Sequence, residues 1–245
     1  MNPVIELLQS HRSIRKFTGE AISEELLQQL LRAGQSAATS SHVQATSIIR
    51  VRETTKREAI AELAGGQAYV ADCAEFLVFC ADMKRVFDAS ERAGTEPRRG
   101  MTEQFIIATV DTALFAQNVA VAAESAGLGI CYIGGVRNNP EQISEILALP
   151  RDVYPVFGFC MGMPDQDPEV KPRLPLEVIV KEDTYSDDGE ATEIAAFDRT
   201  MADYYQRRSS NRKAARWSAQ ISVLFAEKTR PHMRDFLGKR GFELK

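Results

Sequence analysis

The stretch His11-Arg12-Ser13-Ile14-Arg15 places a histidine, two arginines and a serine hydroxyl within five residues, directly after an apolar helical run at residues 4–8. Guanidinium groups bind phosphate oxygens through paired hydrogen bonds, and a hydroxyl and backbone N–H groups can satisfy the remaining lone pairs. The cluster therefore predicts a phosphate site. A solvated helix end would carry the same residue types, so the cluster alone leaves both interpretations open.

Further polar and glycine-rich motifs follow in a fixed order. They are Thr39-Ser40-Ser41, Gly65-Gly66-Gln67, Gly127-Leu128-Gly129, Tyr132-Ile133-Gly134-Gly135 and Lys171-Pro172-Arg173-Leu174-Pro175. With the first cluster and Phe17, this order resembles the FMN-dependent nitroreductase superfamily over essentially the whole chain. It is most similar to the type A oxygen-insensitive NADPH nitroreductases and the NADPH-flavin oxidoreductases grouped with them. The resemblance implies an α+β fold, with a mixed central sheet flanked by helices, and an intertwined homodimer with flavin sites at the interface.

The resemblance also implies which residues contact FMN. The phosphate needs cations, the ribityl chain and ring edge need hydrogen-bonding partners, and the ring face needs backbone N–H donors without bulky side chains. A cation near N1 of the ring would stabilise the anionic reduced flavin. The implied positions are His11, Arg12, Ser13, Ile14, Arg15, Thr39, Ser40, Ser41, Gln67, Tyr132, Ile133, Gly134, Gly135, Lys171 and Arg173.

Each of these motifs also has an ordinary structural interpretation. Residues 39–41 would suit a turn after a helix, and two adjacent glycines commonly end a strand. Lys171 would serve as a surface lysine. Arg173 would suit a solvated loop, although Pro172 and Pro175 restrain its backbone and favour a fixed contact.

A basic run near the C-terminal third holds five cations, namely Arg207, Arg208, Arg212, Lys213 and Arg216. A solvated helix end would have this composition. The resemblance instead implies that the region binds the 2′-phosphate of NADPH, with Arg208 at the position of the family's main arginine. Lys213 stands where arginine is usual, which replaces a bidentate contact by a point charge.

Two residues are implied on the substrate side of the flavin. His42 occupies a position where an aromatic residue is common; it keeps a planar face and adds a titratable group. Arg230, before Pro231, resembles a substrate-side arginine. The chain needs no catalytic nucleophile and no metal in this interpretation, because the flavin N5 carries the hydride.

Composition limits the alternatives. The chain has 245 residues, 44% of them hydrophobic, and a formal net charge of −4, which gives no electrostatic case for nucleic acid or an anionic membrane. We expect no apolar run of the roughly 18–20 residues that a membrane span needs, and no signal peptide. Cys73, Cys80, Cys131 and Cys160 are predicted to be free, buried thiols, as in a cytoplasmic protein.

Hydrophobic periodicity predicts the elements. Helices are expected at 23–36, 55–64, 102–126, 140–148, 191–207, 217–228 and 231–239, strands at 46–52, 75–81, 130–134, 153–161 and 176–181, and polar loops at 88–100 and 164–175. The 102–126 helix is apolar nearly all round, which predicts a core helix at a subunit interface. We expect one domain over 1–245, with a C-terminal helical excursion around 190–230.

Three functions remain open on the sequence alone. The first is a reductase that passes two electrons from NADPH to nitroaromatics, quinones or similar acceptors by a ping-pong mechanism. The second is an NADPH-flavin reductase that supplies reduced FMN to a partner. The third is a flavin-binding regulatory protein without enzymatic activity.

Overall fold

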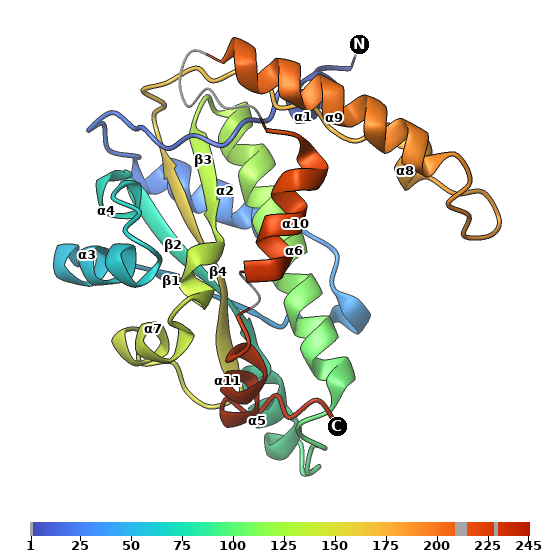
Figure 1. Ribbon diagram of the computed structural model, residues 1–245. Coiled ribbons are helices and arrows are strands. Elements are labelled where there is room, and N and C mark those ends of the chain that lie inside the picture. Colours follow the sequence, from blue (N-terminus) through green and yellow to red (C-terminus); the bar gives the residue numbers. More distant parts are fainter. Residues whose placement is uncertain (1, 209–214, 228–229) are drawn as a thin grey trace. The chain divides into compact units, whose positions relative to one another are not determined.

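The computed structural model describes residues 2–208, 215–227 and 230–245. The chain forms two compact units (Figure 1): Met1–Pro168 with Arg230–Lys245, and Glu169–Thr229. The second unit begins earlier along the chain than the helical excursion expected around 190–230. Each unit has a hydrophobic core of its own.

The first unit contains a four-stranded antiparallel sheet in the order β1-β2-β4-β3 (Figure 1). The strands are β1 (Thr46–Arg50), β2 (Glu75–Asp82), β3 (Gly129–Ile133) and β4 (Val153–Gly162). β2 is buried along its whole length because helices cover both faces of the sheet, which explains its continuous apolar run. Four of the five expected strands are confirmed, to within two residues at each end.

Helices cover each face of this sheet. On one face, α2 (Glu24–Gln35) and α6 (Thr102–Ser125) bury Leu27 and Val119 against Phe79 and Phe159 of the strands. On the other face, α3 (Thr54–Leu63), α4 (Tyr69–Asp72) and α7 (Pro140–Ile146) cover Phe76. The remaining helices of this unit are α1 (Pro3–Gln9), η1 (Ser40–His42), α5 (Lys84–Arg92), η2 (Gly134–Arg137) and α11 (Met233–Lys239). The first unit is therefore a three-layer arrangement.

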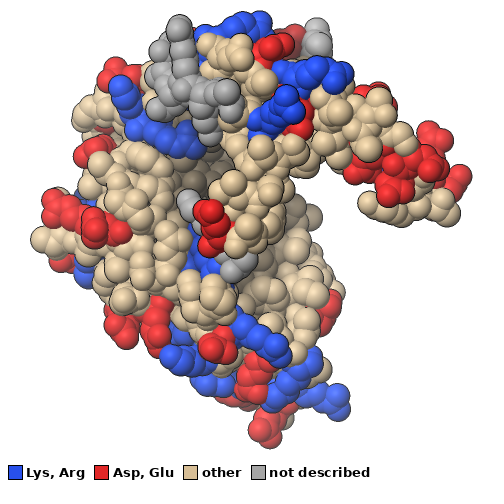
Figure 2. Space-filling view, in the orientation of Figure 1, with Lys and Arg blue, Asp and Glu red and all other residues tan. Residues whose placement is uncertain are grey.

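The second unit consists of α8 (Leu176–Ile179), α9 (Glu190–Arg207) and α10 (Trp217–Glu227) with their connections. Its small core is formed by Phe197, Met201, Tyr204 and Tyr205 of α9, and Trp217 packs on Phe197 with the ring centroids 6.1 Å apart. The exposed loop between α8 and α9 gathers acidic side chains (Figure 2), consistent with Glu182, Asp183, Asp187 and Asp188 in its sequence.

Two of the expected elements are wrong. Residues 176–181 do not form a strand. Leu176–Ile179 is a short helix after Pro175. Leu176 is 70% exposed, because the apolar residues there do not pack on the sheet. Without that strand, every pairing among the described residues is antiparallel, whereas the resemblance implied a mixed sheet. The expected loop at 88–100 is helical up to Arg92, because Phe87 is buried and anchors α5.

Helix α6 is buried on one face only. Asp111, Thr112 and Val119 point inward, whereas Ile106, Val110 and Leu114 are between 44% and 49% exposed. By length and composition alone, α6 is the one helix of the described chain that could cross a membrane, and 33% of the residues in its apolar window are buried. The expectation that no run is long enough was therefore wrong, although α6 packs against α2 and the sheet as the core helix of a folded domain does.

Candidate functional site

The segment that holds the first basic cluster runs alongside β3. The Ile14 N–H donates to the Ile130 carbonyl at 2.9 Å, and the Ile14 side chain is buried. It packs onto Gly129, where a Cβ would lie 2.7 Å from the Ile14 Cβ. Ile14 therefore anchors the segment by packing, while Arg15 beside it is exposed.

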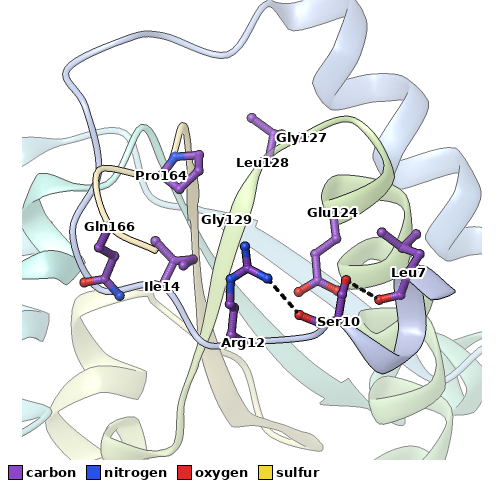
Figure 3. A pocket seen from close by; sticks show the side chains of 10 residues that line it. All are labelled: Leu7, Ser10, Arg12, Ile14, Glu124, Gly127, Leu128, Gly129, Pro164 and Gln166. Atoms are coloured by element: carbon purple, nitrogen blue, oxygen red, sulfur yellow. Dashed lines mark hydrogen bonds between the residues drawn. The ribbon is translucent and has the colours of Figure 1, made fainter. Parts of the chain in front are cut away.

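A pocket of about 180 Å³ lies beside this segment (Figure 3). Its lining residues are Leu7, Ser10, Arg12, Ile14, Glu124, Gly127, Leu128, Gly129, Pro164 and Gln166. Two basic residues here already have carboxylate partners. Arg12 Nη2 lies 2.6 Å from Asp167 Oδ1, and His11 Nδ1 lies 2.6 Å from Glu124 Oε1. A phosphate at Arg12 would displace Asp167, whose side chain is 84% exposed and free to move aside.

Arg15, Gln67 and the glycine pair form a second group. The Tyr69 hydroxyl donates to Gln67 Oε1, and Gln67 Nε2 donates to the Ala64 carbonyl at 2.6 Å. Burial raises the pKa of the Tyr69 hydroxyl, and the charge of nearby Arg15 opposes that shift. A Cβ at Gly135 would lie only 2.2 Å from the Ala64 oxygen, so the absence of a side chain brings this backbone against Gln67.

The glycine pair follows the end of β3, where Ile133 is buried. Tyr132 packs edge-on against Phe157 and Phe159 with ring centroids 5.1 Å away, and burial raises the pKa of its hydroxyl. The structure adds Arg137, which the sequence reasoning missed. A Cβ at Gly134 would lie 3.2 Å from Arg137 Nη2. The only sequence signal was an arginine two residues after the glycine pair.

Arg137 has an arginine neighbour. Burial lowers the pKa of the Arg137 guanidinium, and the charge of Arg230 lowers it further. Arg137 Nη1 donates to the Val156 carbonyl at 2.5 Å, and Arg230 Nε donates to Asn138 Oδ1 at 2.9 Å. The structure thus brings Arg230 close to the glycine pair, which creates a positive region there.

The segment Thr39–Ala45 forms a separate group at the start of β1. Ser41, His42 and Gln44 all have positive φ, and Asp111 of α6 accepts from the Ser40 and Ala45 N–H groups. The Thr39 Oγ1 is buried and finds no partner in the described part of the chain. Sequence reasoning identified residues 39–42 but missed Asp111, which is about 70 residues away along the chain.

Helix α6 spans the distance between two parts of the candidate site, the 39–45 segment and His11. Asp111 holds the 39–45 segment and Glu124 holds His11, and these two α6 residues are 13 positions apart. At a rise of 1.5 Å per residue this is about 20 Å. Sheet order agrees, because β1 and β3 are opposite edge strands of one sheet. One chain therefore does not bring its residues 39–42 to its own His11.

The basic residues of the second unit gather around a tyrosine pair. Lys171 Nζ lies 5.7 Å from the centre of the Tyr205 ring, and the Arg208 guanidinium carbon lies 5.7 Å from the centres of the Tyr204 and Tyr205 rings. Arg173 Nη1 donates to the Lys171 carbonyl at 3.0 Å. Lys213 lies outside the described residues.

Each of the two units carries cations suited to a phosphate, and the first unit, as far as the structure describes it, also carries a hydroxyl without a partner. Within the part of the chain that the structure describes, neither Arg15 nor Arg173 pairs with a carboxylate, which leaves both cations available to an anion. Gly135 is buried, and its missing side chain leaves room for the Ala64 carbonyl and Gln67 of the same chain. The Thr39 hydroxyl is left without a partner among the described residues. An FMN phosphate needs such cations, and its ribityl chain needs such a hydroxyl.

The chain matches known proteins over nearly its whole length. Residues 8–163 match the Nitroreductase family and residues 171–245 match the C-terminal domain of the Nitroreductase family. The chain is 44% identical over 241 residues to the NADPH-flavin oxidoreductase of Vibrio harveyi, with 98% of each chain covered. It is 43% identical over 242 residues to the oxygen-insensitive NADPH nitroreductase of Salmonella typhimurium, covering 99% of each.

A solved structure shares the fold as well. The crystal structure of nitroreductase A from Vibrio parahaemolyticus superimposes with a TM-score of 0.91 at 44% identity, over 98% of each chain. The order of motifs, the fold and the match over both parts of the sequence lead to one conclusion. The chain belongs to the nitroreductase family.

Proposed function

We propose that this chain is an FMN-dependent oxidoreductase that takes electrons from NADPH and reduces nitroaromatics, quinones or similar small molecules. The arrangement that carries the proposal is the Arg15 cation, which pairs with no carboxylate among the described residues, beside Tyr69 and its partner Gln67. Relatives that cover nearly the whole chain are NADPH-dependent flavin or nitro reductases. When bound, FMN would supply the two-electron redox chemistry between the nucleotide and the acceptor.

The protein's own residues bind and orient the reactants. Arg15 and Arg173 hold the flavin phosphate through charge-assisted hydrogen bonds. Thr39 and Ser41 provide hydroxyls for the ribityl chain and ring edge. The partly exposed backbone of Gly134 faces the ring, and Lys171 supplies a positive charge that favours the reduced cofactor.

We also propose that the enzyme is a homodimer whose sites combine both chains. The 39–42 segment and His11 lie about 20 Å apart along α6, so one flavin contacts both groups most simply when each comes from a different copy. The exposed apolar side chains Ile106, Val110 and Leu114 on α6 offer the contact surface. Sedimentation velocity should therefore give twice the chain mass of 27.2 kDa.

An anaerobic titration tests the function. The yellow protein should lose its flavin absorbance on addition of NADPH at lower concentrations than NADH, and recover it when a nitroaromatic or a quinone is added. A protein that NADPH does not bleach would be a flavin-binding regulatory protein instead. A protein that stays colourless with added FMN would contradict the proposal.

A second candidate is a flavin reductase that releases reduced FMN to a partner, as suggested by the name of the Vibrio harveyi relative. The same residues would serve both functions, and retention of the cofactor separates them. Flavin that survives dialysis, with rapid reduction of a nitrofuran, favours the first function. Preferential turnover of added FMN favours the second.

Arg208→Ala is expected to raise the NADPH KM about tenfold to a hundredfold, because it removes one charge-assisted contact worth roughly 1.5–3 kcal/mol. The NADH KM should change little, because NADH lacks the 2′-phosphate. Arg199→Ala is the matched control, because Arg199 is an exposed arginine of the same helix α9 outside the basic run. Equal effects on NADPH and NADH would argue against a 2′-phosphate site at Arg208.

We propose further that both units act as one catalytic module in the cytoplasm. The two family matches follow one another along the chain with few residues between them. All four cysteines are free and buried, as the sequence predicted, and free thiols suit a reducing compartment.

A further inference from the structure

The turn from Ser40 to Ala45 has an unusual backbone. Ser41, His42 and Gln44 adopt φ values of 47°, 56° and 55°, in the left-handed region that residues with a side chain rarely occupy. Three such residues within four positions persist only where the surroundings hold them. Contacts from outside the turn must therefore stabilise its backbone.

One buried carboxylate holds both ends of the turn. Asp111 is 1% exposed; its Oδ1 accepts from the Ser40 N–H at 3.0 Å and its Oδ2 accepts from the Ala45 N–H at 3.3 Å. No ion pair with Asp111 is present in the described part of the chain. Its charge is thus stabilised by these backbone donors, since a buried charge needs such compensation.

Neighbouring contacts hold α6 and the turn at the start of β1. Thr112, the next residue of α6, donates to the Ala108 carbonyl at 2.7 Å and lies 3.3 Å from the Thr46 hydroxyl. From the solvent side, Arg85 Nη1 donates to the Gln44 carbonyl at 3.3 Å. Arg85 is half exposed, whereas Asp111 is enclosed, so the carboxylate is the firmer of the two anchors.

We propose that Asp111 is a positioning residue that holds Thr39, Ser40 and Ser41 in the geometry that contacts the flavin. This inference rests on the proposed function, because it assigns the turn to the cofactor site. Asp111 touches neither cofactor nor substrate and acts only through the two backbone N–H groups. Thr39 lies directly before the turn, and its hydroxyl has no partner among the described residues, so the backbone that Asp111 holds sets its direction.

The variant Asp111→Asn separates this role from simple packing. Asparagine has nearly the same volume, but it offers one oxygen, and its amide nitrogen would face a second N–H donor. We expect the FMN dissociation constant to rise roughly ten- to hundredfold. In the FMN-free protein, the Ser40 and Ala45 amides should exchange hydrogen faster. Asp88→Asn, at a partly exposed site paired with Lys84 on α5, is the matched control and should change neither.

Rescue by glycine sharpens the test. Glycine adopts positive φ without a steric cost, so Gln44→Gly in the Asp111→Asn background should recover part of the FMN affinity. If Asp111→Asn does not fold, Gln44→Gly in the native chain carries the test, and it should increase the protection of the Ser40 amide and the affinity for FMN together.

The outcomes are distinguishable. Faster exchange in Asp111→Asn with unchanged FMN affinity overturns the inference and leaves the proposed function intact. The inference is also overturned if Gln44→Gly, in the native chain or in the Asp111→Asn background, changes neither the Ser40 amide exchange nor the FMN affinity. If the unsubstituted protein binds no FMN at all, the proposed function fails, and this inference fails with it.

Discussion

Replacing Arg15 and Arg173 together by alanine is expected to give a protein that purifies without FMN. Each arginine can make a charge-assisted contact to the phosphate, worth about 1.5–3 kcal/mol. Loss of both should weaken binding by roughly 10²- to 10⁴-fold. The ratio of flavin to protein absorbance after purification, and the FMN dissociation constant by fluorescence, measure the effect.

The control must remove the same charge without touching the site. Arg92→Ala with Arg199→Ala meets that requirement, because each is an exposed helical arginine and each unit of the chain contributes one. This control should keep its FMN. If the Arg15 and Arg173 double variant purifies with full occupancy, the phosphate assignment is wrong.

Gly135→Ala is expected to lower the melting temperature and to reduce FMN binding. The new Cβ would lie 2.2 Å from the Ala64 carbonyl oxygen and 2.5 Å from Gln67 Nε2. Because the first of these is backbone, the chain must shift, at a typical cost of about 1–3 kcal/mol. For a chain of this length that corresponds to a decrease of roughly 2–12 °C, measurable by thermal unfolding with and without FMN.

The adjacent glycine provides a matched comparison. At Gly134 the nearest atom to a new Cβ is Arg137 Nη2, 3.2 Å away at the end of a flexible side chain. Gly134→Ala should therefore have a much smaller effect on the melting temperature. Equal destabilisation by the two substitutions would contradict the claim that the contact with the Ala64 carbonyl causes the loss of stability at Gly135.

Regular periodicity made most of the fold predictable. Leu27 and Leu30 define the buried face of α2, and residues 76–81 of β2 form an apolar run typical of a strand covered on both faces. These elements are long, and their core contacts agree with the helix or strand preference of their own residues. The observed ends of these elements differ from the predicted ends by only one or two residues, because fraying and capping set where an element stops.

Short or weakly patterned elements could not be predicted. Residues 176–181 have the β-branched, apolar character of a strand, yet a strand forms only if a partner edge is available, and none is paired with them in the described chain. Helix α5 carries few apolar residues, and its anchor Phe87 is visible only once the C-terminal segment packs around it.

The same limit applies to the candidate site. Residues at motif positions, such as Arg15, Gln67 and Gly135, were named from the sequence, and the structure places them close together. Asp111 and Arg137 were missed because their importance comes from what they face in three dimensions. A carboxylate in an apolar helix was the one local sign of Asp111.

The 20 Å between the two parts of the site has a thermodynamic consequence. If each flavin touches both subunits, cofactor binding and subunit association are thermodynamically coupled, and each strengthens the other by mass action. Dilution that separates the chains would then also release the cofactor, and excess flavin would hold the pair together.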